Sequence, residues 1–145
     1  MNNKNIYIIA STFYADLSSN LINAAQDVVK DVLDTNTLNV ITVPGAFEIP
    51  GMVKKIIDNK NPDLIITLGV LIKGETAHFE YISNAVSNSI SMLTIQSDIP
   101  IIFGIITAYD KKQAIARSSS DLNNKGYEAM ETGLKMLDLY DKYSK

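Results

Sequence analysis

The fold is decided by the stretch "TLGVLIKGETAHFEY", Thr67–Tyr81. Its first part belongs to a continuous apolar run, Leu64–Ile72, of the kind that forms a strand buried on both faces. The run then breaks into a lysine, a glycine, a glutamate, a threonine and His78, which is the only histidine in the chain. From Phe79 onward, apolar residues recur at helical spacing. The stretch therefore predicts a buried strand, a polar turn and a helix in direct succession.

Strands and helices alternate along the rest of the chain. Short apolar runs predict three further strands, at Ile6–Ala10, Leu38–Val43 and Ile101–Thr107. Apolar residues at helical spacing predict helices at Leu17–Val32, Ile49–Ile57, Phe79–Leu93, Asp110–Arg117 and Tyr127–Tyr140. Asp16 or Ser18 could cap the first of these helices, and Pro50 fits the first turn of the second. A polar link, Ser118–Asn124, separates the last two helices.

This alternation predicts an α/β fold in which four parallel strands carry helices on both faces of the sheet. No linker or repeat interrupts the pattern, so we expect a single domain over residues 1–145. In open parallel sheets, ligands bind outside the carboxyl ends of the strands. We therefore expect the chemistry in the loops after the strands, which are Ser11–Asp16, Pro44–Glu48, Lys73–His78 and Ala108–Asp110.

Composition narrows the class of protein. Of the 145 residues, 46% are hydrophobic, which is enough for a folded core, and the formal net charge of -3 provides no basic surface for nucleic acid. The absence of cysteine rules out disulfides and thiolate nucleophiles. The first apolar run is too short for a signal peptide, and no stretch approaches the roughly 20 apolar residues of a membrane span. We expect a cytoplasmic protein that binds neither nucleic acid nor membrane.

The first two loops carry groups that suit a flat, hydroxylated ligand. Phe13 lies beside Tyr14 in the first loop, and Phe47 lies in the second. An aromatic ring can stack on a heterocycle. The carboxylate of Glu48 can accept several hydroxyl hydrogen bonds, which suits a sugar or a polyol.

The third loop carries groups that suit an anion and proton transfer. Gly74–Thr76 lies between a strand and a helix, where free N–H groups and the positive helix end favour an anion. Arg117 could add a bidentate phosphate contact. An imidazole such as that of His78 exchanges protons near neutral pH. No group of His, Asp and Glu has metal-ligand spacing, so we expect no metal.

Each of these residues also has a purely structural interpretation. The structural roles are end plugs of the sheet for Phe13 and Phe47, a helix N-terminal charge for Glu48, a helix C-terminal charge for Arg117, an i,i+3 ion pair for Lys125 and Glu128, a helix cap for Thr76 and a plain surface position for His78. On the residues alone, the sequence predicts an α/β domain with a candidate anion and aromatic site.

Four segments carry a more specific signal. They are "VPGAFEIP" (43–50), "LGVLIKGETAHFEYISN" (68–84), "PIIFGIIT" (100–107) and "QAIARSSSDLNNKGYEA" (113–129). In this order and spacing they resemble the 6,7-dimethyl-8-ribityllumazine synthase family, from about Ile6 to Leu137. The resemblance implies a flavodoxin-like three-layer α/β/α sandwich with a four-stranded parallel sheet. It also implies a homopentamer, or a multiple of one, with active sites at the subunit interfaces.

The resemblance implies a transferase of riboflavin biosynthesis that acts in the penultimate step. The enzyme condenses 5-amino-6-(D-ribitylamino)uracil with 3,4-dihydroxy-2-butanone 4-phosphate to give 6,7-dimethyl-8-ribityllumazine, phosphate and water. It needs no cofactor and no metal, and riboflavin synthase is a candidate partner.

The resemblance also implies a role for each matching residue. In the uracil site, Phe13 stacks on the ring, and Leu71 and Ile72 contact the pyrimidine edge. In the ribityl site, Ala46 and Phe47 line the ribityl chain through their backbone, and Glu48 accepts hydrogen bonds from the ribityl hydroxyls. At the phosphate, Glu75 and Thr76 bind through their N–H groups, and Arg117 binds from a neighbouring subunit. Phe103 and Lys125 also come from that neighbouring subunit. At the reacting atoms, His78 transfers protons, and Glu128 matches an acidic position beside His78.

The match departs from the family at two places. Thr12-Phe13-Tyr14 stands where many members have Arg-Phe-Asn, so the resemblance assigns no role to Tyr14. The segment Ser118–Asn123 lacks the glycine-rich composition of many capsid-forming members. Two alternatives stay open at this point: a non-catalytic flavodoxin-like module that binds a phosphorylated or flavin-like ligand, and a purely structural shell protein.

Overall fold

Four parallel strands form one sheet in the order β2-β1-β3-β4 in the computed structural model, which describes residues 3–31, 37–120 and 123–144. The strands are β1 (Ile6–Ser11), β2 (Leu38–Val43), β3 (Leu64–Ile72) and β4 (Ile101–Ala108). Each lies within a residue of its predicted position, because a continuous apolar run bounded by polar turns is a strong strand signal.

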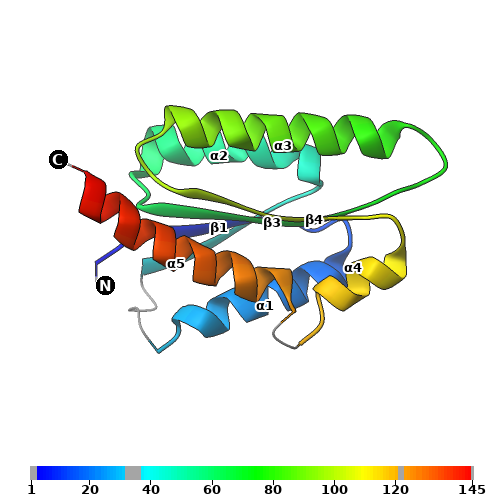
Figure 1. The fold of residues 1–145 in the computed structure, drawn as a ribbon, viewed down its shortest axis with the longest axis horizontal. Helices are drawn as coiled ribbons and strands as arrows, with labels where there is room; N and C mark the ends of the chain where they lie inside the picture. The colour runs from blue at the N-terminus through cyan, green and yellow to red at the C-terminus, as the bar shows by residue number, and fades with distance from the viewer. Residues whose placement is uncertain (1–2, 32–36, 121–122, 145) are drawn as a thin grey trace.

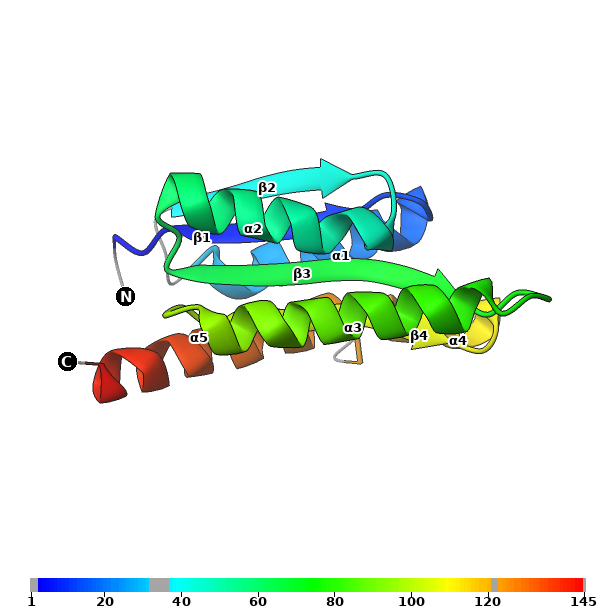
Figure 2. The same cartoon turned by 90° about the horizontal axis from the view of Figure 1, so that it is seen from above.

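Helices cover both faces of the sheet, so the molecule has three layers (Figure 1). One face carries α2 (Ile49–Lys60) and α3 (His78–Gln96), and the other carries α1 (Ala15–Val29), α4 (Lys111–Arg117) and α5 (Lys125–Tyr143). Seen from above, α2 lies toward β1 and β2, and α3 lies toward β4 (Figure 2). The predicted three-layer α/β/α class with a four-stranded parallel sheet is therefore confirmed.

Strand side chains alternate between two cores, one on each face of the sheet. Ile6 and Ile8 of β1 pack with residues of α1 and α5, whereas Ile9 packs with residues of α2 and α3. In β3, Ile66 faces the first core and Ile65 the second, and all of these side chains are fully buried. Burial on both faces explains why the strands read as unbroken apolar runs.

One expectation about the start of the first helix is wrong, and one short helix was not predicted. The first helix is capped at Tyr14, without a side-chain hydrogen bond, and not at Asp16 or Ser18. Ser18 is buried, and its hydroxyl donates to the carbonyl of Ser11, because the helix packs this face against the end of β1. The short 3-10 helix η2 (Ala46–Glu48), which precedes α2, was not predicted from the sequence. The expected end of the first helix at Val32 lies outside the described residues.

The start of α5 is fixed by a buried asparagine and a close helix contact. The Asn124 carboxamide oxygen accepts hydrogen bonds from the N–H groups of Gly126 and Tyr127, at 2.7 and 3.3 Å. Gly126 is itself buried against α1, where an added Cβ would lie 2.0 Å from the carbonyl oxygen of Leu21. The polar link before α5 includes residues 121–122, which lie outside the described residues. The cap and the glycine together fix where Lys125 lies.

No helix within the described ranges is long and apolar enough to cross a membrane. The longest, α3 and α5, have 19 residues each, and both carry polar residues along their exposed faces. The chain therefore shows no helical membrane span in the part that the structure describes.

Replacement of Gly126 by alanine should destabilise the protein by about 3 kcal/mol, because the new methyl group meets backbone atoms that cannot move aside cheaply. Gly51→Ala is the matched control. Gly51 lies exposed in α2 with nothing within 4 Å of an added Cβ, so this variant should gain up to about 1 kcal/mol from helix propensity. Urea denaturation measures both, and equal stability of the two variants would contradict the close α1–α5 contact.

Candidate functional site

A cavity of about 490 Å³ opens at the carboxyl ends of β1, β2 and β3, under the start of α3. We call it the histidine cavity. Its lining residues are Phe13, Tyr14, Gly45, Ala46, Phe47, Glu48, Val70, Leu71, Ile72, Gly74, Thr76, His78, Phe79 and Ile82. Three loops far apart in sequence thus meet where the parallel topology predicts a ligand site.

The register of the strands explains the floor of the histidine cavity. The pairing of β1 with β3 ends at Ala10 and Leu68, and the pairing of β1 with β2 ends at Ser11 and Val43. β3 continues to Ile72, so the segment 70–72 extends past its neighbour β1 and borders the cavity instead of a strand. The polypeptide edge of this segment therefore faces ligand space.

Two of the three phenylalanines of the cavity, Phe13 and Phe47, are exposed within the chain. The side chains of Phe13 and Phe47 are 73% and 58% exposed, so they do not fill the ends of the sheet. The backbone around Phe13 is nevertheless fixed, because the N–H and the hydroxyl of Thr12 both donate to the carbonyl of Val43, at 2.9 and 3.3 Å. Exposed rings on a fixed backbone are suited to stacking on a ligand.

Glu48 lies at the cap position of α2 but makes no side-chain capping hydrogen bond. Its N–H donates to the carbonyl of Gly45 at 3.1 Å, which closes the η2 turn. A Cβ added at Gly45 would lie 3.0 Å from the Glu48 Oε1 atom, so the carboxylate lies back over the glycine. Glu48 is exposed and lines the cavity, so its oxygens are available to a ligand with hydroxyl groups.

The anion loop, residues 73–77, joins β3 to α3 and is attached to the neighbouring strand. The N–H of Lys73 donates to the carbonyl of Ala108 at 2.9 Å, and the Lys73 ammonium lies 3.9 Å from a Glu80 carboxylate oxygen. Gly74 and Thr76 line the histidine cavity next to the N-terminus of α3, whose dipole favours an anion. The loop therefore starts from a fixed point and leads directly to His78 at the start of α3.

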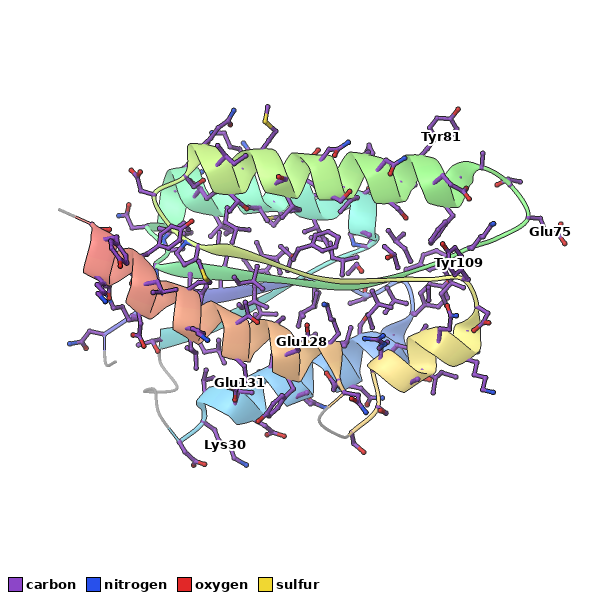
Figure 3. All side chains as sticks on the ribbon, in the orientation of Figure 1. Lys30, Glu75, Tyr81, Tyr109, Glu128 and Glu131 are labelled. Atoms are coloured by element: carbon purple, nitrogen blue, oxygen red, sulfur yellow. The ribbon has the colours of Figure 1, made fainter. Side chains whose placement is uncertain are left out.

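One expectation about the anion loop, the helix cap, is wrong. Thr76 is not the cap of α3, since that position belongs to Ala77. Its hydroxyl instead accepts a hydrogen bond from the N–H of His78 at 3.3 Å. The loop extends one residue further, to Ala77, before α3 begins. Glu75 does not line the cavity, and its side chain points away from the body of the molecule (Figure 3).

A second cavity, of about 540 Å³, lies beside the edge strand β4. We call it the arginine cavity. Its lining residues are Phe103, Ile105, Ile106, Thr107, Ala108, Tyr109, Gln113, Ala116, Arg117 and Lys125. It brings together the three residues that the resemblance assigns to a neighbouring subunit's site, and it shares no lining residue with the histidine cavity.

The register shows how far Phe103 lies from the carboxyl end of β3. Phe103 pairs with Thr67, which lies five residues before Ile72 at the carboxyl end of β3. At about 3.3 Å per residue, Phe103 lies roughly 16 Å along the sheet from that end. Phe103 lines the arginine cavity and not the histidine cavity of its own chain.

Glu128 does not lie beside His78 within the chain. It is on α5, across the sheet from α3, where its carboxylate pairs with the Lys125 ammonium at 3.3 Å (Figure 3). The structural interpretation of this i,i+3 ion pair therefore holds in the single chain.

Elsewhere on α5, the negative charge of Glu131 and the hydrogen bond between the side chains of Glu131 and Tyr127 raise the pKa of Tyr127.

Several residues of the histidine cavity were not predicted from the sequence as site residues. Phe79 and Ile82 are in the first turns of α3 and were counted only as core positions of a helix. The apolar stripe of a helix that begins beyond the sheet edge faces the loops at its first turn, and that position was the available signal. Within the described ranges, no group of three or more His, Asp and Glu side chains could hold a metal ion.

A parallel α/β sheet with a histidine, a carboxylate and exposed rings around one cavity at its carboxyl edge defines an enzyme that binds a small polar ligand. The chain belongs to the 6,7-dimethyl-8-ribityllumazine synthase family, whose model matches residues 3–141. It is a transferase that carries out the lumazine synthase reaction of riboflavin biosynthesis. The predicted family and reaction are confirmed, and the non-catalytic alternatives lose their support.

Phe13→Ala should weaken product binding about tenfold, since stacking on an aromatic ring contributes strongly to heterocycle binding. The same change should alter the free energy of unfolding by less than about 1 kcal/mol, because the ring is exposed. Leu21→Ala, at a fully buried position, should cost about 2 to 5 kcal/mol and serves as the stability control. Titration with the lumazine product and urea denaturation provide the two values, and a Phe13→Ala variant as unstable as Leu21→Ala would contradict the ligand role.

Proposed function

We propose that the histidine cavity of one subunit and the arginine cavity of the next form a single active site. The observation that carries this proposal is the division of the groups that the reaction needs. The stacking ring, the carboxylate, the anion loop and the imidazole line one cavity, whereas Arg117 and Lys125 line the other. Neither cavity holds the full set, so a second copy supplies the missing half.

The ribitylaminouracil takes the inner part of the histidine cavity. Its ring stacks on Phe13, and its polar edge meets the backbone of Leu71 and Ile72, where β3 extends past β1. The ribityl chain runs along the backbone of Ala46 and Phe47 toward the carboxylate of Glu48. Phe103 and Lys125 of the neighbouring copy close the outer side of the site.

The butanone phosphate takes the outer part of the cavity, beside the anion loop. The N–H groups at Glu75 and Thr76 and the N-terminus of α3 favour its phosphate. Arg117 of the neighbouring copy adds a bidentate contact, for which the planar guanidinium is well suited. An arginine from the second subunit explains why the histidine cavity itself contains no lysine or arginine among its lining residues.

The reaction needs proton transfers more than a strong nucleophile. The free amine of the uracil attacks the ketone, and loss of water gives a Schiff base. Phosphate then leaves, the resulting enol becomes a ketone, and the ribityl nitrogen attacks that ketone and closes the ring with loss of water. His78, exposed at the mouth of the cavity, accepts and returns the protons of these steps. The rest of the rate enhancement comes from holding two reactants together.

The exposed face of α3 supports a homo-oligomer. Tyr81, Met92 and Ile95 are 75%, 56% and 77% exposed. Their spacing at about 3.6 residues per turn places them on one side of the helix, where Tyr81 points outward (Figure 3). Exposed large apolar side chains of this kind are typical of a surface that another chain covers. We propose a homopentamer or a multiple of it, in the cytoplasm, with small-molecule substrates, no cofactor, and riboflavin synthase as a candidate partner.

His78→Ala should slow turnover about 10- to 100-fold, at or below the low end of the usual contribution of a general acid–base, because substrate positioning remains. The measurement is lumazine absorbance after the two substrates are mixed. The Michaelis constants and the oligomer size should stay close to those of the parent protein. A variant with unchanged turnover would remove His78 from the mechanism.

Arg117→Ala should raise the Michaelis constant for the butanone phosphate by at least about tenfold, because a charge-assisted phosphate contact is lost. Lys112→Ala is the matched control, since Lys112 is exposed on the same helix and lines neither cavity. The control should leave this constant unchanged. If both variants bind the phosphate substrate as tightly as the parent protein, the phosphate assignment fails.

A further inference from the structure

We propose that Tyr14 is a positioning residue that holds the Phe13 ring at the angle needed to stack on the uracil. The inference rests on the proposed function of Phe13 as the stacking platform. It goes beyond that function, because it assigns a role to a second residue, which acts on the ligand site through the Phe13 ring. Both residues line the histidine cavity.

The first observation is the geometry of the two rings. Their centroids lie 5.0 Å apart and their planes meet at 75°, which is an edge-to-face arrangement. This geometry is among the favoured ones for aromatic pairs, because the positive edge of one ring meets the negative face of the other. The contact therefore restrains the orientation of Phe13 as well as its position.

The second observation is that the two rings differ in burial. Phe13 is 73% exposed, whereas Tyr14 is half-buried and packs against the core on the α1 and α5 face of the sheet. Tyr14 is therefore the fixed member of the pair and Phe13 is the member that depends on it. Without Tyr14, an exposed phenylalanine would sample several rotamers.

The third observation is that the backbone on both sides of Phe13 is already held. Thr12 is bonded to Val43 at the end of β2, and the N–H of Ser18 donates to the carbonyl of Tyr14 at 2.9 Å in the first turn of α1. The backbone therefore needs no further support from the Tyr14 ring. What remains for the ring to fix is the side-chain orientation of Phe13.

Orientation of a stacking platform affects the binding of one substrate more than the chemistry. A Phe13 ring that is already oriented avoids the entropy cost of ordering it when the uracil binds. The butanone phosphate does not stack, so its binding should not depend on Tyr14. The expected signature is a change in the Michaelis constant for the uracil alone.

The test compares Tyr14→Phe with Tyr14→Leu in the full-length protein. Tyr14→Phe keeps the ring pair and should behave like the parent protein. Tyr14→Leu keeps the buried apolar volume and loses the ring, so it should raise the Michaelis constant for the uracil by about 3- to 10-fold, the range expected for an aromatic pair. The turnover number and the Michaelis constant for the butanone phosphate should change by less than about twofold.

The double variant Phe13→Ala/Tyr14→Leu shows whether Tyr14 acts through Phe13. If it does, the double variant should have the uracil Michaelis constant of Phe13→Ala alone, because the second change has nothing left to disturb. Tyr143→Ala is the matched control, since Tyr143 lies exposed at the end of α5 and lines neither cavity. It should leave both Michaelis constants unchanged.

Three results would overturn the inference. They are an unchanged uracil constant in Tyr14→Leu, equal increases in both Michaelis constants, and full additivity in the double variant. An unchanged constant in Phe13→Ala would instead remove the stacking role of Phe13 itself. The single Phe13 variant therefore distinguishes a failure of the proposed function from a failure of the Tyr14 assignment.

Discussion

The constraint on which the structure depends is the parallel alignment of all four strands. Because the strands share one direction, every loop that follows a strand emerges at the same edge of the sheet. Residues near positions 13, 47 and 78 therefore meet around one cavity although they are far apart in sequence. The greater length of β3 adds the second requirement, since its last residues extend past β1 and give the cavity a polypeptide floor.

The same constraint also divides the site. β4 is an edge strand, so the groups along it and along α4 face a separate cavity on the outer side of the sheet. Arg117 and Lys125 lie there because α4 and the start of α5 follow β4 directly. The buried cap at Asn124 and the close contact of Gly126 with α1 hold Lys125 at the rim of that cavity. The proposed active site is in this sense completed by two adjacent copies and not by one chain alone.

Much of this could be predicted from the sequence, and the rest could not for physical reasons. Apolar runs such as Leu64–Ile72 located the strands, because burial on both faces leaves an unbroken pattern. Caps were harder: Ser18 looked like a capping hydroxyl, yet tertiary packing turned it toward the carbonyl of Ser11. The place of Glu128 across the sheet from His78, and the edge-to-face pair of Phe13 and Tyr14, depend on side-chain packing that no linear pattern records.

The most direct test of the divided site mixes two impaired variants. His78→Ala subunits keep an intact arginine cavity, and Arg117→Ala subunits keep an intact histidine cavity. When equal amounts are unfolded and reassembled together, about one quarter of the interfaces should pair two intact halves, and activity should recover to about one quarter of the parent value. Activity no higher than the mean of the two variants, in assemblies shown to contain both, would contradict an active site shared between subunits.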